Sequence, residues 1–139
     1  MSKENDIQKV ATMLEMQDAM NRKVHPDWFN QDFEWYRAIW IECGEMLDHY
    51  GWKWWKHQEP DREQVILELV DIFHFGLSLR IDGVKSYEQI ATEILEQMNG
   101  ISKGETFRET LELLAGAAVV NKAFDVSSFA GCLQQIDMS

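Results

Sequence analysis

Apolar residues recur every three or four positions along most of the chain, which is the spacing of one face of an α-helix. The first such stripe joins Ile7, Val10, Leu14, Gln17 and Asn21, so it begins apolar and ends polar. The sequence has no clean alternating run bounded by hairpin turns, which is the usual signal of strands. The pattern predicts an all-α protein.

Two segments, 33–50 and 65–80, are apolar on almost every side of a helix. A helix of this kind is usually buried, so we expect both segments at the centre of the fold. A short loop that includes the polar and aromatic run 51–56 separates them and permits antiparallel packing. The sequence therefore predicts an antiparallel helical bundle, built as a single domain over residues 1–139.

Helix starts are marked by a short polar residue followed three positions later by Gln or Glu. The pairs are Asp61 with Gln64, Ser86 with Gln89, and Thr106 with Glu109. They predict helices over about 61–80, 86–99 and 106–124. A last helix is expected to begin at Ser127 or Ser128.

The charge balance narrows the choice of partners. The chain has 13 Lys and Arg against 24 Asp and Glu, a formal net charge of -11, which argues against nucleic acid or an anionic membrane surface as a partner.

The longest uncharged apolar run, 113–120, is shorter than the roughly 20 residues of a membrane helix. The polar N-terminus does not resemble a signal peptide. Because Cys43 and Cys132 lack metal-type or disulfide-type spacing, we expect a cytoplasmic protein.

Two carboxylate pairs stand out within the apolar segments. Glu42 and Glu45 are three positions apart in the first, and Glu68 and Asp71 are three apart in the second. Residues at this spacing are neighbours on a helix surface, and antiparallel packing would bring the two pairs face to face. Acidic pairs often lie on a solvated helix edge, which is the alternative interpretation.

Carboxylates inside apolar surroundings are costly unless a cation compensates them. Mg²⁺ prefers oxygen ligands and keeps positions for water and phosphate, so the two pairs predict a magnesium site. Di-iron bundle proteins use Glu-x-x-His on two helices, and neither pair supplies that histidine. His74 lies three residues beyond Asp71 and keeps iron only as a weaker alternative.

Four motifs follow one another between about residues 10 and 80. They are MLEMQDAMN (13–21), E-x-x-E (42–45), WKWWK (52–56) and ELVDIFHF (68–75). In this order they resemble the dimeric dUTPase family of the all-α NTP pyrophosphatase superfamily, which includes the MazG-like enzymes. The resemblance implies a homodimer that hydrolyses dUTP to dUMP and pyrophosphate with Mg²⁺. Mn²⁺ would be a substitute metal and dUDP a further substrate.

The resemblance also implies roles for the acidic residues. Glu42, Glu45, Glu68 and Asp71 match the family's metal motif, and Glu42 would be the catalytic residue that orients and deprotonates the attacking water. These roles agree with phosphoryl chemistry, in which metals neutralise charge and a carboxylate positions the nucleophile.

The resemblance places the base and the sugar in a pocket. Gln17 and Asn21 match the residues that read uracil, and an amide offers both a donor and an acceptor to that base. Trp54 matches the position whose ring lines the nucleoside pocket, and His74 matches another pocket position. The alternatives are ordinary helix-surface polarity for the two amides and a satisfied core histidine for His74.

Lys53 and Lys56 are candidates for contact with the phosphates, one of them being equally suited to a solvated loop position. The family's late Y-x-x-K-N motif and its basic N-x-x-x-G-Y stretch are missing from this sequence. We therefore expect a domain without the phosphate-closing motifs, in which the metal site persists and turnover is weak.

Two other functions remain open from the sequence. One is a related house-cleaning pyrophosphatase with a different base preference, such as dCTP. The other is a non-catalytic helical dimerisation module that keeps the bundle and leaves the acids without a metal.

Overall fold

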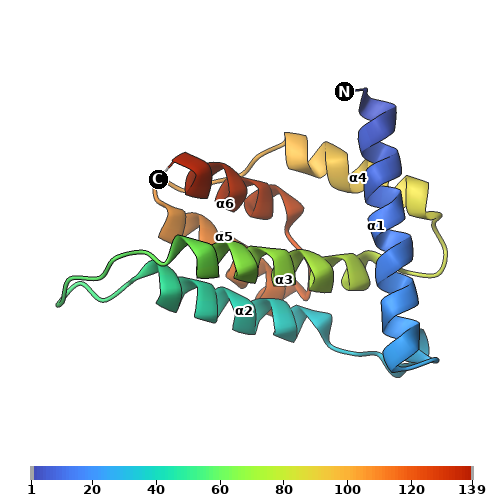
Figure 1. Cartoon of the computed structure of the whole chain (residues 1–139), viewed down its shortest axis with the longest axis horizontal. Coiled ribbons are helices and arrows are strands. Elements are labelled where there is room, and N and C mark those ends of the chain that lie inside the picture. Colours follow the sequence, from blue (N-terminus) through green and yellow to red (C-terminus); the bar gives the residue numbers. More distant parts are fainter. Residues whose placement is uncertain (1, 139) are drawn as a thin grey trace.

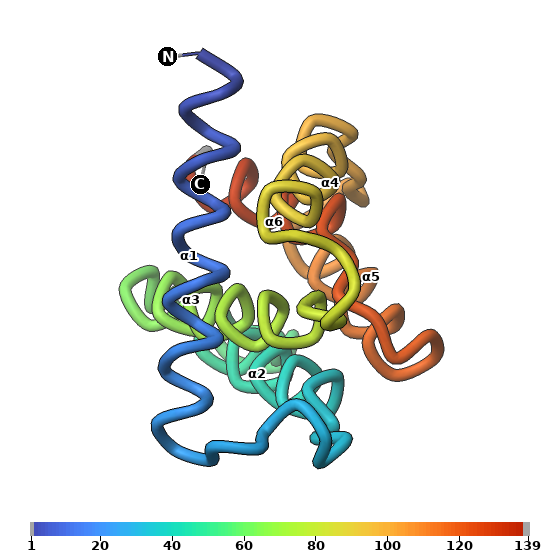
Figure 2. The backbone as a smooth tube through the Cα atoms, turned by 90° about the vertical axis from the view of Figure 1, so that its right-hand side faces the viewer, coloured from blue at the N-terminus to red at the C-terminus, as the bar shows by residue number. Residues whose placement is uncertain are grey.

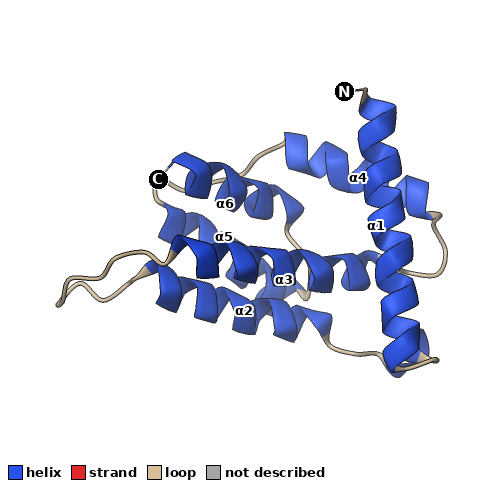
Figure 3. Cartoon of the chain, viewed as in Figure 1, coloured by secondary structure: helices blue, strands red, loops and turns tan. Residues whose placement is uncertain are grey.

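The computed structural model describes residues 2–138, with side chains described through Asp137. Six α-helices and one short 3₁₀ helix make up this part of the chain, and it contains no strand. The elements are α1 (Lys3–Val24), η1 (Trp28–Gln31), α2 (Trp35–Tyr50), α3 (Arg62–Arg80), α4 (Tyr87–Asn99), α5 (Phe107–Asn121) and α6 (Val126–Met138). The all-α prediction is confirmed (Figure 3). No helix of residues 2–138 is long and apolar enough to cross a bilayer.

The centre of the fold is an antiparallel hairpin of α2 and α3 (Figure 1). Helices α5 and α6 cover one side of this hairpin. Helix α1 crosses α3 near its C-terminal end at a steep angle and packs along its upper half against α4 (Figure 2). The result is that α1 and the α2–α3 hairpin meet at one corner of the molecule.

Helix α1 is fixed at this corner by a buried carboxylate. Asp18, 5% exposed, accepts hydrogen bonds from Trp28 Nε1 at 3.0 Å and from the Tyr87 hydroxyl, and pairs with Arg22 at 3.0 Å. Burial, followed by the contact with Asp18, raises the pKa of Tyr87 to about 12, so the phenol remains a donor at neutral pH. One side chain therefore connects α1, η1 and α4.

The predicted helix starts at Asp61, Ser86 and Thr106 are confirmed. Each side chain accepts the backbone N–H three residues later. At Ser86 the Gln89 side chain also returns to the cap backbone, which completes a capping box.

Two predicted boundaries were wrong. Helix α5 ends at Asn121 and not near 124, because Lys122 adopts a left-handed conformation with φ of 51°. Helix α6 begins at Val126, ahead of the predicted Ser127 or Ser128. The residue that accepts there is Asp125, whose carboxylate binds Ser128 N at 3.2 Å and Ser128 Oγ at 2.6 Å.

The expectation that α2 and α3 are buried on all sides was also wrong. Their inner faces do form the core, with Ile39, Cys43, Met46, Val65, Leu69 and Ile72 all almost fully buried. Trp40, Ile41, Leu67 and Val70, however, are between 46% and 54% exposed. The four other α-helices do not surround both members of the hairpin, so each member keeps an apolar strip at the surface.

Gly76 gives a test of the packing around α3. A methyl group there would overlap the ring of Phe124. We expect Gly76→Ala to lower the free energy of unfolding by about 1–3 kcal/mol through overpacking. Gly116→Ala in α5 is the matched control, because nothing lies within 4 Å of its added methyl group. Helix propensity alone should make that variant about 0.5–1 kcal/mol more stable in urea unfolding. Equal effects at the two positions would contradict the packing argument.

Candidate active site

Four carboxylates from the two hairpin helices lie near one another. Glu42 and Glu45 come from α2, and Glu68 and Asp71 come from α3. Glu68 is 5% exposed, Glu42 is half-buried, and the other two are exposed. The antiparallel packing of α2 and α3 therefore places the two pairs near one another.

This proximity changes the protonation of Glu42. Burial is the largest cause that raises its pKa from 4.5 to about 7, followed by the charges of Glu45, Asp71 and Glu68. Burial also raises the pKa of Glu68, although a hydrogen bond from His49 opposes that shift. The same hydrogen bond raises the pKa of His49. The cluster thus carries more negative charge than its own surroundings compensate.

The donor set suits a hard divalent cation. Among the described residues, no group of three or more His, Cys, Asp or Glu side chains converges closely enough to hold a metal ion. The four carboxylates nevertheless offer only oxygen ligands, which Mg²⁺ prefers. Cys43, behind them in the core, has its pKa raised to about 12 by burial and is not a thiolate ligand. His74 Nδ1 lies 2.7 Å from Gln17 Oε1, so this ring nitrogen is already engaged with an amide.

A closed polar network joins α1 to α3 beside this cluster. Gln17 Nε2 donates to Asn21 Oδ1 at 3.0 Å, and Asn21 Nδ2 donates to Ser78 Oγ at 3.0 Å. Ser78 Oγ in turn donates to the carbonyl of His74 at 3.1 Å, and His74 Nδ1 lies 2.7 Å from Gln17 Oε1. These contacts hold the four side chains in fixed orientations relative to one another.

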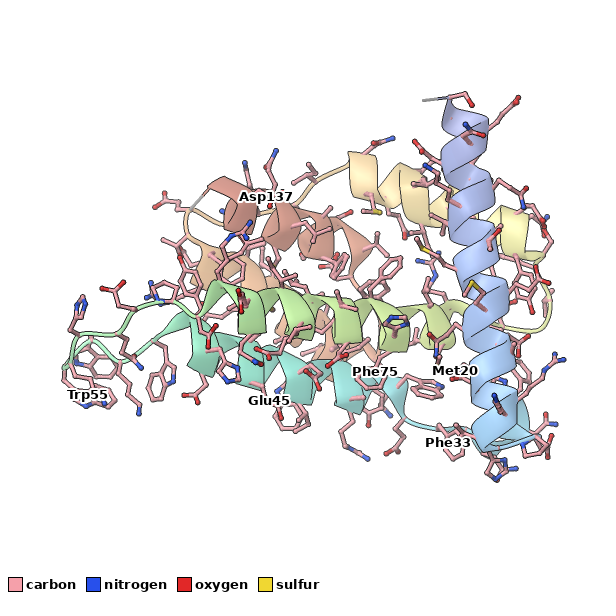
Figure 4. All side chains as sticks on the ribbon, viewed as in Figure 1. Met20, Phe33, Glu45, Trp55, Phe75 and Asp137 are labelled. Atoms are coloured by element: carbon pink, nitrogen blue, oxygen red, sulfur yellow. The ribbon has the colours of Figure 1, made fainter. Side chains whose placement is uncertain are left out.

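The polar network and one carboxylate of the cluster, Asp71, line the same cavity. A hollow of about 310 Å³ is lined by Gln17, Asn21, His74 and Asp71, with the rings of Trp35 and Phe75 as its apolar walls. Figure 4 shows Met20 of α1, Phe75 of α3 and Glu45 of α2 on the same side of the molecule. The structure therefore places Asp71 of the predicted metal motif beside the predicted base-reading residues, Gln17 and Asn21, whereas the other three acids of the motif are not among the residues that line this cavity.

The tryptophan-rich loop lies elsewhere. Trp54 is 86% exposed, and Figure 4 shows its neighbour Trp55 at the end of the hairpin that points away from α1. The base of the loop is fixed by Arg108 Nε, which donates to the Gly51 carbonyl at 2.6 Å. Within one chain, Trp54, Lys53 and Lys56 are thus not brought to the cavity beside α1.

Sequence reasoning missed two polar residues of this site. Ser78 follows His74 by one helical turn, and His49 follows Glu45 by one turn, so both lie on the faces already marked by the motifs. That spacing was a usable signal. The aromatic walls, Trp35 and Phe75, carried no signal that separated them from core residues.

The sequence profile of the dUTPase family matches residues 9–139, nearly the whole chain. The chain therefore belongs to the dUTPase family, and its enzyme class is that of dUTP diphosphatases. A comparison with curated proteins finds no significant match.

The polar network can be tested at Ser78, which is 2% exposed. Ser78→Ala leaves Asn21 Nδ2 without its partner, so we expect a loss of about 1–3 kcal/mol in the free energy of unfolding. The exposed loop residue Ser102 gives the control Ser102→Ala, which should change stability by less than about 0.5 kcal/mol. Urea unfolding with an unchanged m-value measures both. A neutral Ser78→Ala would show that the network does not hold Asn21.

Proposed function

We propose that the chain hydrolyses dUTP to dUMP and pyrophosphate in a Mg²⁺-dependent reaction. The observation that carries this proposal is the shared cavity, in which Asp71 of the carboxylate cluster lies with Gln17 and Asn21. A nucleotide whose base occupies this cavity has its phosphates next to the carboxylates. Membership of the dUTPase family supports the choice of dUTP.

The two amides suit recognition of a uracil edge. An amide has two N–H donors and two carbonyl lone pairs. The Gln17 and Asn21 amides each use one N–H donor and one carbonyl lone pair in the network. Each therefore keeps one N–H donor and one lone pair for a ligand. Uracil presents two carbonyl oxygens and one N–H, which this set can satisfy. The bonds to His74 and Ser78 fix the two amides in advance and reduce the entropy cost of binding.

The carboxylates would supply the chemistry of the phosphate end. Glu42, Glu45, Glu68 and Asp71 would hold Mg²⁺, with Mn²⁺ as a substitute. When bound, the metal neutralises charge on the phosphate oxygens. Glu42 accepts a proton from the attacking water, whose oxygen forms the new bond to phosphorus. The bridge between the α- and β-phosphates breaks, and pyrophosphate leaves.

The lysines of the loop fit the far end of such a nucleotide. The order along α3 is His74, Asp71, Glu68 and then the loop, so the loop lies beyond the carboxylates on the side away from the base. Lys53 and Lys56 are therefore proposed to meet the terminal phosphates. Trp54 lies at the loop end of the hairpin, away from the proposed nucleoside pocket of its own chain. We propose that it lines the nucleoside pocket of a second copy.

A hydrolysis panel tests the reaction. With Mg²⁺ we expect the purified chain to convert dUTP to dUMP and pyrophosphate, and to lose this activity with EDTA. Glu42→Gln should lower kcat by about 10²–10⁴-fold, because the proton acceptor is removed. Glu112→Gln, an exposed acid on α5, is the matched control and should leave kcat unchanged.

The same panel separates the other functions. A higher kcat/KM for dCTP than for dUTP would replace the base assignment and keep the chemistry. No Mg²⁺-dependent hydrolysis of any nucleotide, together with more stable Glu45→Ala and Asp71→Ala variants, would favour a non-catalytic dimerisation module.

A homodimer is the second part of the proposal. Five apolar side chains of α1 and α3 form an exposed strip, which we call the outer apolar face: Met13, Met16, Met20, Leu67 and Val70, all 46% to 65% exposed. A hollow of about 340 Å³ runs along it beside Gln17 and His74. An exposed apolar patch of this kind commonly marks a protein interface. A second copy of the chain on this face would border the proposed nucleotide cavity.

Val70→Lys places a charge in the outer apolar face, so we expect it to shift the protein from dimer to monomer. Val84→Lys is the control, because Val84 is 88% exposed in a loop outside this face. Sedimentation equilibrium measures the mass of each variant. A native protein at the mass of one chain, or a Val70→Lys protein that remains dimeric, would contradict the assigned interface.

A further inference from the structure

One side chain outside the family-type motifs touches the carboxylate cluster directly. His49 lies in the last turn of α2, and its Nδ1 is 2.8 Å from Glu68 Oε1 on α3. His49 follows Glu45 by four positions and Glu42 by seven, so all three share one face of α2. The imidazole therefore lies beside the carboxylate cluster.

Glu68 is the member of the cluster whose orientation matters most. It is the buried one, with a side chain 6% exposed, while that of His49 is 40% exposed. The contact engages Oε1, and no other hydrogen bond to the Glu68 carboxylate is found within residues 2–137. One oxygen is thus occupied by His49, and Oε2 keeps its lone pairs for another ligand.

We propose that His49 is a positioning residue of the carboxylate site, one that holds Glu68 so that Oε2 faces a bound divalent cation. This inference rests on the metal site of the proposed function. Groups that hold a metal ligand from behind commonly change metal affinity by 10–100-fold when they are removed. Without such a partner the Glu68 carboxylate would have to be oriented at the moment of cation binding, which costs side-chain entropy.

The contact has an opposite interpretation, in which the imidazole competes with the cation for Glu68. The two interpretations differ in sign. Removal of a positioning residue weakens metal binding, whereas removal of a competitor strengthens it. Metal affinity measured without nucleotide therefore decides between them.

The test uses Mn²⁺ alone, with binding to the full chain followed by electron paramagnetic resonance. His49→Asn places its amide N–H near the position of Nδ1, whereas His49→Gln places it near that of Nε2. We expect the His49→Asn variant to keep its Mn²⁺ affinity within about 3-fold of the native value. The His49→Gln variant should bind Mn²⁺ about 10-fold more weakly or worse. His57→Gln is the matched control, because His57 forms a similar 2.6 Å contact with Glu59 on the exposed loop. It should bind Mn²⁺ as the native chain does.

Three results would overturn the inference. Equal affinity in the Asn and Gln variants would show that the Nδ1 contact does not position Glu68. Tighter binding in either variant would identify His49 as a competitor. A native chain that binds no Mn²⁺ would remove the metal site itself, and with it the proposed function. Asn and Gln are both neutral amides, so a loss of Mn²⁺ affinity that is equal in the two variants reports the loss of the imidazole. Only a difference between the variants reports the contact at Nδ1.

Discussion

Repulsion among four carboxylates is the constraint on which the site depends. Two packed helices hold Glu42, Glu45, Glu68 and Asp71 near one another, and burial, followed by the charges of the other three acids, raises the pKa of Glu42 to about 7. The core contacts of the hairpin, from Ile39 to Ile72, stabilise this unfavourable grouping. Such a cluster has its lowest energy when a cation lies within it, so the apolar packing prepares the protein for a charged ligand.

The second half of the site depends on a different interaction. Gln17 and Asn21 lie on α1, and Asp18 holds α1 to η1 through Trp28 and to α4 through Tyr87. Because Asp18 directly follows Gln17 in sequence, the residue that fixes the helix and the residue proposed to read the base have almost the same position. A shift of α1 would therefore move the amides relative to Asp71.

The sequence predicted local features, such as helix caps, better than it predicted which side chains are exposed to solvent. Caps at Asp61, Ser86 and Thr106 follow from interactions within one turn, and the carboxylate pairs follow from helical spacing. Burial of α2 and α3 was overestimated, because an apolar helix that faces solvent and one that faces the core have the same composition. The place of Trp54 could not be predicted either. The order of the motifs along the chain does not show that the length of the α2–α3 hairpin separates Trp54 from α1 in space.

The attachment of α1 has a consequence for motion. Helix α1 contacts the hairpin mainly at α3, and its more extensive contact is with α4. We therefore expect the helix that carries the amide-lined side of the cavity to open more readily than the α2–α3 hairpin. Amide hydrogens of α1 would then exchange sooner than those of α3, and a bound nucleotide, by bridging the two units, would slow the exchange of α1.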